Sequence, residues 1–523
     1  MLSTTFFSKY SCFAVVCVVY TMQTDMDFLD PAKERRNHLF LLVGYGLVAL
    51  AIGIASLVLL YASYGYSVDR EGEVSQHGLV FVSSQPPGST VLVDGKNQGR
   101  TNTKLELDAG TYTLKITAKG YQDWQRQVTV NGGDLQRFDY PFLVPTKLTT
   151  TTTDSYAASP QFVSQSPNKR LVLLAEPTTP GQFTLLNIRD PQALTTTIVK
   201  PLDNSFTVGK GDQKWLPVEW ADDNRHILFE HTFTEEGGVA KEYVILDVTK
   251  PEDTVNVTQT LNLAKLSVVS LFNKKATQVY VYNGETKTLQ SFNLGTTAVR
   301  SQLSEIVAYK TYADDTVLYA TTRPPSGKEL PGQVSIVLQQ GSRSTTLRRY
   351  PAGEQAYLLD IARYDSEWYI VVGSSVDKGV YIYKNPQTQV LKTASLPRPW
   401  RFLHIEQPSY VAFSDNARFL LAQNGQRVAI YDAESVETNA YALADPLDSP
   451  QTHLSWMDGH RLVYVSGGQL RILDYDNTNK RNLGTAFPAY EPLFTPDYQA
   501  VFTVSPLSDG KPSLRLNNLV VKK

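Results

Sequence analysis

An uncharged apolar run long enough to span a bilayer stands near the N-terminus of the chain. It extends from Leu39 to Tyr61 and contains no Asp, Glu, Lys or Arg. A bilayer core about 30 Å thick requires about 20 apolar residues in helical form. The run therefore predicts one transmembrane helix, and everything after it lies on one side of a membrane. A buried core helix is less favoured, because such runs are rare in soluble helices, and a cleaved signal peptide normally has a shorter apolar region.

The charges that flank this run predict its orientation. A basic cluster that includes Arg35 and Arg36 stands just before it, and the first charged residue after it is Asp69. Segments with an excess of Lys and Arg stay in the cytoplasm. We therefore expect a single-pass protein of the cell membrane, with residues 1–38 as a cytoplasmic tail and residues 39–61 as the transmembrane helix. Membrane lipid is then a partner through this helix, and the C-terminal domains are extracytoplasmic.

The segment 1–25 is interpreted in two ways. It is either an over-extended start, since Met22 and Met26 offer alternative starts, or a weak interfacial segment, since its apolar stretch is too short to span. Both cysteines of the chain, Cys12 and Cys17, lie in this piece. The expected extracytoplasmic part therefore has no disulfide and no cysteine metal site.

Charge and composition narrow the class of the part that follows the span. The net charge is −2 and the isoelectric point is near 6.4, so we expect no nucleic-acid partner. Thr, Tyr, Val and Leu are abundant and helix-period patterns are scarce, which is typical of sheets. The sequence therefore predicts an all-β protein with one N-terminal transmembrane helix, joined by a linker over residues 62–77.

Residues 78–145 alternate short apolar runs with turn residues. Strands are predicted at Leu79–Ser84 and Thr90–Gly95, and the second ends in Asp94-Gly95, which is a strong hairpin signal. The segment Thr111–Gly120 alternates strictly between apolar and polar residues, as a half-buried strand does. These patterns predict a small sandwich of antiparallel strands.

The same residues resemble the PEGA domain family. The turn Pro86-Pro87-Gly88-Ser89 takes the place of the family's naming motif, and it is followed in the family's order by VLVDG, by Gly99 and Thr101, and by AGTYTLKITAKGY at Ala109–Tyr121. The chain departs from the family at Ser89, where alanine is usual, and at Asn102, where proline is usual. The resemblance implies an extracytoplasmic β module without enzymatic activity.

A repeated pattern occupies residues 146–523. In each copy an aromatic residue precedes a polar turn and an apolar strand, and a second strand often ends in Asp. The copies begin at Phe162, Trp220, Phe272, Tyr312, Tyr364, Phe413, Trp456 and Phe494. Short strands that recur with a period of about 40–50 residues are typical of the blades of a β-propeller.

The turns of these copies resemble the WD40-like repeat of TolB-type propellers. The cores of the turns are Ser166-Pro167-Asn168, Asp222-Asp223-Asn224, Ser414-Asp415-Asn416 and Pro496-Asp497. We expect eight blades, with seven as the alternative. The last copy is short, and we predict that the strand at Lys147–Thr153 completes its blade and closes the ring.

No motif in the sequence points to catalysis. The chain contains no HExxH, no paired cysteines, no GxSxG and no glycine-rich phosphate loop, so we expect no catalytic residue, no metal site and no cofactor. The Asp and Asn residues of the turns offer a calcium site as one interpretation. The favoured one is that they cap their own turns. The alternation of Asp474, Asp476 and Thr478 lacks the glutamate of an EF-hand loop.

Two groups of residues are candidates for ligand binding. Trp400, flanked by Arg398 and Arg401 in a segment outside the repeat pattern, offers a ring for stacking on a sugar or a peptide. Tyr121 and Trp124 offer a binding face on the small β domain. For both groups the favoured alternative is internal packing.

We therefore expect a membrane-anchored extracytoplasmic binding or scaffold protein of the bacterial cell envelope. In this hypothesis the small β domain holds the propeller off the membrane, and a propeller face recognises an envelope protein or a polysaccharide. A glycan hydrolase or lyase with acids at the mouth of the central channel is the alternative, and a purely structural spacer is a third hypothesis. Converging acids with a His or Arg in a pocket would favour the enzyme, and an exposed aromatic patch would favour binding.

Overall fold

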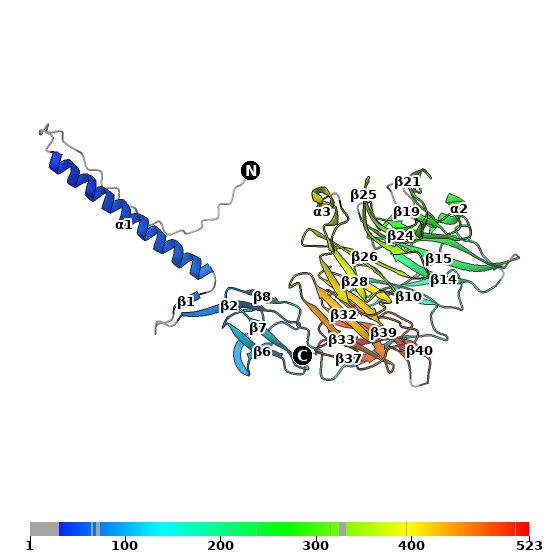
Figure 1. The fold of residues 1–523 in the computed structure, drawn as a ribbon. Helices are drawn as coiled ribbons and strands as arrows, with labels where there is room; N and C mark the ends of the chain where they lie inside the picture. Colours follow the sequence, from blue (N-terminus) through cyan, green and yellow to red (C-terminus); the bar gives the residue numbers. More distant parts are fainter. Residues whose placement is uncertain are drawn as a thin grey trace, which may run out of the picture. The chain divides into compact units, whose positions relative to one another are not determined.

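The computed structural model describes residues 31–63, 66–68, 74–209, 211–236, 238–313, 315–323, 331–393, 395–507 and 509–521 (Figure 1). Both interpretations of the segment 1–25 lie outside this part. The chain forms two compact units, which are residues 1–79, 106–110 and 130–135, and residues 80–105, 111–129 and 136–523.

The first unit contains the helix α1, which runs over 33 residues from Pro31 to Ser63 (Figure 1). It includes the predicted span, and among the described residues it is the one helix long and apolar enough to cross a membrane. None of the stretch His38–Tyr61 is buried against protein. The segment is therefore not a core helix, as the absence of charge predicted.

The small β domain consists of two four-stranded sheets, and it departs from the predicted antiparallel sandwich at β8, which runs parallel to β2: the Leu79 N–H donates to the Asp134 carbonyl and the Ser83 N–H to the Phe138 carbonyl. One has the order β4-β3-β6-β7, and in the other β2 pairs with β1, β5 and β8. The strands are β1 (Tyr66–Val68), β2 (Val74–Val82), β3 (Thr90–Val93), β4 (Lys96–Arg100), β5 (Thr103–Asp108), β6 (Gly110–Thr117), β7 (Trp124–Val130) and β8 (Leu135–Phe138). The predicted hairpin turn joins β3 to β4, with positive φ angles of 47° at Asp94 and 79° at Gly95, as a two-residue hairpin of the primed type requires.

Eight four-stranded antiparallel sheets follow within the described residues between 149 and 518, as the spacing of the copies predicted. Blade 1 holds β10 (Phe162–Gln165), β11 (Leu171–Ala175), β12 (Phe183–Asn187) and β13 (Thr195–Val199). Blade 2 holds β14 (Lys214–Trp220), β15 (His226–Glu235), β16 (Gly238–Asp247) and β17 (Val255–Asn256). Blade 3 holds β18 (Ser267–Phe272), β19 (Lys275–Asn283), β20 (Thr288–Asn293) and β21 (Val299–Leu303). Blade 4 holds β22 (Ile306–Tyr312), β23 (Thr316–Thr321), β24 (Gln333–Gln340) and β25 (Arg343–Pro351).

The other four blades complete the series. Blade 5 holds β26 (Tyr357–Tyr364), β27 (Glu367–Ser374), β28 (Gly379–Lys384) and β29 (Arg401–His404). Blade 6 holds β30 (Tyr410–Phe413), β31 (Phe419–Asn424), β32 (Arg427–Asp432) and β33 (Thr438–Ala442). Blade 7 holds β34 (Ser455–Trp456), β35 (Arg461–Ser466), β36 (Gln469–Asp474) and β37 (Arg481–Thr485). Blade 8 holds β38 (Leu493–Phe494), β39 (Ala500–Pro506), β40 (Pro512–Asn518) and β9 (Thr149–Ser155). Short helices are η1 (Pro251–Asp253), α2 (Val257–Leu261) and α3 (Pro386–Thr393).

The blades form a closed ring. First strands of successive blades contact one another, as β22 and β26 do, and second strands such as β23 and β35 are buried on both faces. Such strands read as continuous apolar runs, which is why the copies are visible in the sequence. Leu174 of blade 1 and Phe502 of blade 8 belong to one apolar cluster, so the last blade packs on the first.

The strand that completes blade 8 comes from the start of the propeller. Residues Thr149–Ser155 form β9 and pair antiparallel with β40, from Ser513 opposite Ser155 to Asn518 opposite Thr149. This confirms the predicted closure, with the strand two residues further along than expected. The first and last strands of the propeller, β9 and β40, therefore pair in one sheet. This pairing supplies the fourth strand of blade 8 and closes the ring.

Candidate functional site

The Asp and Asn residues of the repeated turns hydrogen-bond to the backbone of their own turns. Asp223 Oδ1 accepts from the N–H groups of Arg225 at 2.9 Å and His226 at 3.0 Å. The side-chain oxygens of corresponding residues in other blades accept from the N–H two residues later; these are Asn168, Asn416, Asp458 and Asp497. The turns are therefore capped by these side chains, in agreement with the favoured interpretation.

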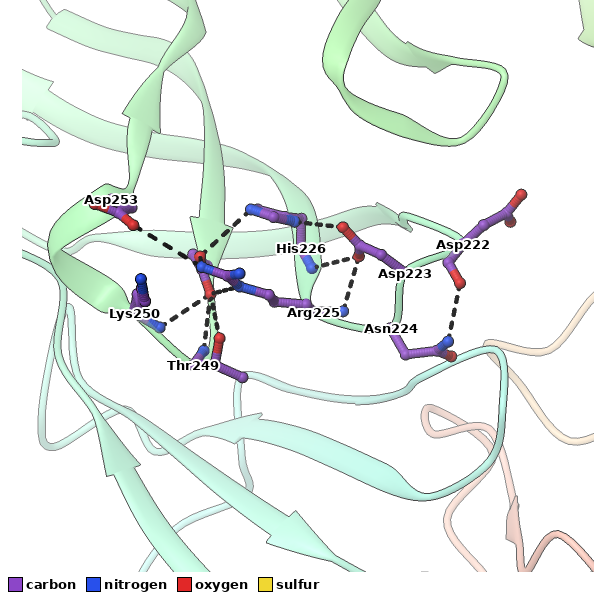
Figure 2. A network of polar contacts seen from close by, with 9 residues as sticks. Asp222, Asp223, Asn224, Arg225, His226, Thr249, Lys250 and Asp253 are labelled. Carbon is purple, nitrogen blue, oxygen red and sulfur yellow. Dashed lines mark hydrogen bonds and ion pairs between the residues drawn. The ribbon is translucent and has the colours of Figure 1, made fainter.

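Polar side chains gather at one end of the strands of blade 2, where the turn between β14 and β15 lies beside the last residue of β16 (Figure 2). The guanidinium of Arg225 donates to both carboxylate oxygens of Asp247, with Nε 2.7 Å from Oδ1. Asp247 is fully buried, and its Oδ1 also accepts from the N–H groups of Thr249 at 2.9 Å and Lys250 at 3.0 Å. Both oxygens of the Asp247 carboxylate therefore accept hydrogen bonds from the protein.

The imidazole of His226 lies between two carboxylates of this cluster (Figure 2). Its Nδ1 is 2.6 Å from Asp223 Oδ2, and its Nε2 is 3.4 Å from Asp247 Oδ2. A neutral imidazole donates through one nitrogen only, so the short contact to Asp223 identifies Nδ1 as the donor when the ring is neutral.

Both carboxylates are held in their ionised form. Burial raises the pKa of Asp247, but the hydrogen bonds from Arg225 and from the backbone that follows outweigh it and hold the pKa well below its usual range. Burial likewise opposes ionisation of Asp223, but the N–H of Arg225 and the ring of His226 lower its pKa. A general acid for glycoside cleavage needs the opposite, a carboxyl whose pKa is raised.

The same arrangement recurs in blade 6, which indicates a structural role. There Arg418 donates to both oxygens of the buried Asp432 at 2.9 and 2.7 Å. Asn416 caps the same turn by accepting the Arg418 N–H at 3.2 Å. The pairing of an arginine after the turn with an aspartate at the end of the third strand is therefore part of the blade framework.

A cavity of about 590 Å³ lies beside the blade 2 cluster. It is bordered by Asp222, Asp223, His226 and Asp253 on one side and by Lys274 and its neighbours in blade 3 on the other. Acids and a histidine therefore meet in a pocket, as the enzymatic alternative requires. The pKa directions of Asp223 and Asp247 argue for a structural cluster instead.

A single lysine connects the turns of four blades. Lys169 of blade 1 donates from Nζ to the Met457 carbonyl of blade 7 at 3.3 Å and to the Tyr498 hydroxyl of blade 8. The same Nζ lies 3.8 Å from Asp415 Oδ2 of blade 6. The side chain of Asp415 is 58% exposed, yet the surrounding turns desolvate it and raise its pKa, with Lys169 opposing the rise and Asp458 adding to it. If the enzymatic alternative holds, Asp415 is the candidate for its general acid.

The predicted Trp400 site is assembled in part. Trp400 precedes β29 in blade 5, its ring is 39% exposed, and its Nε1 donates to the Tyr431 hydroxyl of blade 6 at 3.0 Å. The Arg401 guanidinium lies 4.4 Å from the ring centroid, and Lys384 Nζ lies 5.7 Å from it. Arg398 is exposed, and its N–H donates to Gln389. The structure therefore brings Trp400 and Arg401 together as a cation–π pair, whereas Arg398 has its recorded contact elsewhere.

The second predicted pair, Tyr121 and Trp124, is used inside the second unit. Trp124 is 1% exposed, and its Nε1 donates to Asp474 Oδ2 of blade 7 at 2.8 Å. The hydroxyl of the half-buried Tyr121 accepts from the Val521 N–H at 2.8 Å. Internal packing, the favoured alternative, describes both residues.

A second cavity, of about 570 Å³, opens between the β15–β16 hairpin and α2. Beneath it lies a buried pair, in which His231 Nδ1 is 2.9 Å from Glu242 Oε1. Glu242 also accepts from the Thr207 N–H at 2.7 Å and from Asn256 Nδ2 at 2.7 Å. Burial opposes ionisation, but these hydrogen bonds lower the pKa of Glu242, so the floor of the cavity is a satisfied ionised carboxylate.

Trp215, which stands apart from the repeat pattern in the sequence, packs against His231 of this buried pair and does not line the cavity. It is 1% exposed, and its ring stacks on the His231 imidazole with centroids 4.0 Å apart. Phe206 and Phe233 also contact the imidazole ring. Sequence reasoning missed this cavity, because its walls come from several separate segments between Thr207 and Ser267.

Comparison with known families adds one assignment. Residues 77–143 match the family model described as the PEGA domain. The chain carries a PEGA domain. This confirms the resemblance drawn from the Pro86-Pro87-Gly88-Ser89 turn and from Ala109–Tyr121.

Solved structures add distant similarities to propeller proteins. They include apo AztD from Citrobacter koseri, with 10% identity over 83% of this chain and 99% of that chain and a TM-score of 0.36. The Cps50 (Swd1) β-propeller domain of Myceliophteria thermophila has 12% identity over 65% of this chain and 100% of that chain, with a TM-score of 0.35. An oligogalacturonate lyase in complex with manganese has 14% identity over 71% and 96%, with a TM-score of 0.37. No curated protein matches the chain in sequence.

The PEGA domain contacts blade 7 through residues that, apart from Asp476, the sequence analysis had not singled out. Arg126 lies 5.0 Å from the ring centroid of Tyr475 and 3.5 Å from Asp476, and Tyr140 stacks on His460 with centroids 4.5 Å apart. The stretch around Asp476, which had offered a loop for calcium, therefore receives the PEGA domain. No local pattern could have shown this, because the partners belong to distant parts of the chain.

Proposed function

We propose that this chain is a membrane-anchored, extracytoplasmic binding protein of the bacterial cell envelope, whose propeller recognises an envelope protein or polymer. The uncharged helix α1 and the basic cluster before it support a single-pass anchor with the C-terminal part outside the cytoplasm. The PEGA domain and the propeller support a binding or scaffold role. The loops of a propeller form binding surfaces that are held in place by a rigid framework of strands.

The cavity of about 570 Å³ in blade 2 carries this proposal. Val239 and Leu266 on its walls are 77% and 58% exposed, whereas the polar groups on its floor already have partners. A concave surface with open apolar walls and a satisfied floor is suited to recognition. The polar cluster of Figure 2, in contrast, has its carboxylates held ionised by arginine and histidine.

Site-specific photo-crosslinking of the full chain in living cells tests the proposal. A photoreactive phenylalanine analogue at Val239 is expected to give discrete adducts, whereas the same residue at Val436, which is also exposed but lies in blade 6, serves as the control. Adducts at both positions with equal yield, or at neither, would contradict recognition through this cavity.

One observation favours a second candidate, a glycan hydrolase or lyase. Asp415, where the turns of four blades meet, has a raised pKa and lies 3.8 Å from Lys169. A carboxyl whose pKa is raised is better suited to donate a proton in acid catalysis than an ordinary aspartate. Incubation of the full chain with envelope polysaccharides would then release new reducing ends or unsaturated products, and Asp415→Asn would abolish the release. Equal release by the variant would exclude Asp415 as the acid.

A further inference from the structure

Blade 2 lacks most of its fourth strand. In the seven other blades the fourth strand pairs with at least four residues of the third, as β13 does with Phe183–Asn187. In blade 2 the third strand β16 has ten residues, but β17 pairs only with Val244 and Ile245. After β17 the chain turns into α2, so the N-terminal half of β16 is a strand edge.

The backbone of this edge points into the cavity. The Tyr243 N–H donates to Thr258 Oγ1 on α2 at 2.8 Å, so it faces away from β15. Since backbone groups alternate sides along a strand, the N–H and C=O groups of Lys241 and Val239 face the same way. The hairpin between β15 and β16 gives the same result. Glu235 pairs with Gly238 across a two-residue connection, so the backbone groups of Gly238 face β15 and those of Val239, the next residue, face away from it. Within the described residues, no hydrogen bond is recorded to these outward groups of Val239 and Lys241.

The space beside this edge is the cavity of about 570 Å³. Val239 and Lys241 border it on one side, and Leu263 and Leu266, which follow α2, border it on the other. The Lys241 ammonium is turned back to Glu230, with Nζ 3.2 Å from Oε2, so this charge is paired within the sheet. Charged side chains on exposed strand edges commonly prevent pairing with another chain. Lys241 does not cover this edge, because its ammonium is paired with Glu230.

We propose that an extended peptide segment of a partner protein adds to β16 along Val239–Lys241 and completes the fourth strand of blade 2. This inference rests on the proposed binding function and names the chemistry of the ligand. The unpaired groups alternate donor and acceptor at the spacing of a strand, and an extended peptide backbone matches that pattern where a sugar or a lipid tail does not. The apolar walls at Val239 and Leu266 would receive apolar side chains at alternate positions of the peptide.

A displayed library of random linear heptapeptides, selected on the full chain in detergent, tests the proposal. Enriched peptides are expected to carry apolar residues at every second position. The decisive variant is Lys241→Pro, which removes an outward N–H without removing a bond to β15. It is expected to weaken binding of an enriched peptide at least tenfold, whereas Lys241→Ala, which keeps the N–H, is expected to leave it within twofold.

A matched proline control exists in blade 1. Counted from the hydrogen bond of the Ile188 N–H to the Arg170 carbonyl, the alternation directs the N–H of Thr196 in β13 outward and away from β12. Thr196→Pro therefore places proline on another exposed edge, outside the cavity, and is expected to leave peptide binding unchanged. Two N-methylated forms of an enriched peptide, methylated at odd or at even positions, are compared. Only the form whose methyl groups replace the N–H groups that face β16 is expected to lose binding.

Hydrogen exchange on the unmodified chain keeps the test independent of variant folding. The amides of Val239 and Lys241 are expected to exchange freely alone and to be protected at least tenfold by a saturating enriched peptide. The proposal is overturned if no peptide is enriched, if Lys241→Pro binds like the unmodified chain, or if these amides gain no protection. If crosslinked adducts form at Val239 and persist in Lys241→Pro, edge pairing fails while the binding function stands.

Discussion

Removal of the charge of Asp474 should change how the stability of the protein depends on pH. Asp474 is buried beneath the PEGA domain, where its Oδ2 accepts from Trp124 Nε1 at 2.8 Å and from Asn479 Nδ2 at 2.9 Å. Burial raises its pKa to about 6; the charge of Arg461 opposes the rise, that of Asp476 adds to it, and the two hydrogen bonds oppose it. The folded protein therefore binds a proton at this carboxyl at a pH where the unfolded chain has released it.

The sign follows from linkage. Between pH 4 and pH 6 the folded state holds more protons than the unfolded state, so the contribution of Asp474 to the free energy of unfolding falls as the pH rises. The difference between a pKa of about 6 and the ordinary 3.8 corresponds to about 3 kcal/mol. Asp474→Asn keeps an oxygen for the Trp124 N–H and carries no charge. The variant should match the unmodified protein near pH 4 and exceed its stability by up to about 3 kcal/mol near pH 7.

Urea unfolding followed by tryptophan fluorescence, at half-unit steps from pH 4 to pH 7.5, measures this difference. The comparison uses variant minus unmodified protein at each pH, which cancels the titration of the other carboxyls. Asp509→Asn, at an exposed position near the last hairpin of blade 8, is the matched control and should show no such trend. A difference that stays flat with pH, or that shrinks as the pH rises, would refute the reasoning.

Three other changes should have effects of defined direction. Arg418→Ala leaves the buried Asp432 without its bidentate partner and should lower the free energy of unfolding by about 3 kcal/mol, measured by denaturation against the exposed control Arg427→Ala. Deletion of residues 149–155 removes the closing strand of blade 8 and should make the propeller sensitive to protease, whereas a protease-resistant deletion would show that closure is dispensable. A single cysteine at exposed Val436, in a chain whose two natural cysteines are replaced, should react with a membrane-impermeant maleimide on intact cells; protection until lysis would place the propeller in the cytoplasm.

The parts of the fold that could be predicted are those written in local patterns. The uncharged stretch from Leu39 to Tyr61, the Asp94-Gly95 hairpin and the recurring aromatic, turn and strand each leave a signal within a short stretch of sequence. Closure through β9 was predictable for a related reason, because the last copy was one strand short and a spare strand preceded the first.

The parts that could not be predicted depend on partners far apart in the chain. Internal packing was the favoured interpretation of Trp124, but the sequence could not show that its indole N–H donates to Asp474, 350 residues later. Likewise, nothing local marks Lys169 as the side chain that connects turns of blades 1, 6, 7 and 8. Trp400 was a stacking candidate in the sequence, but its hydrogen bond to the Tyr431 hydroxyl joins blade 5 to blade 6, and no residue spacing indicates such a contact.

Departure from the repeat is a better guide to recognition in this propeller than the repeat itself. The capped turns and the arginine–aspartate pairs recur between blades, so selection for the fold alone explains them. Blade 2 breaks the pattern three times, with the long β15–β16 hairpin, a two-residue β17 and the helix α2 in place of a strand. An exposed strand edge is a liability that proteins usually cover, and here the chain supplies the short helix and leaves the edge open. An open edge favours aggregation unless it is occupied, and the peptide segment proposed above would occupy it.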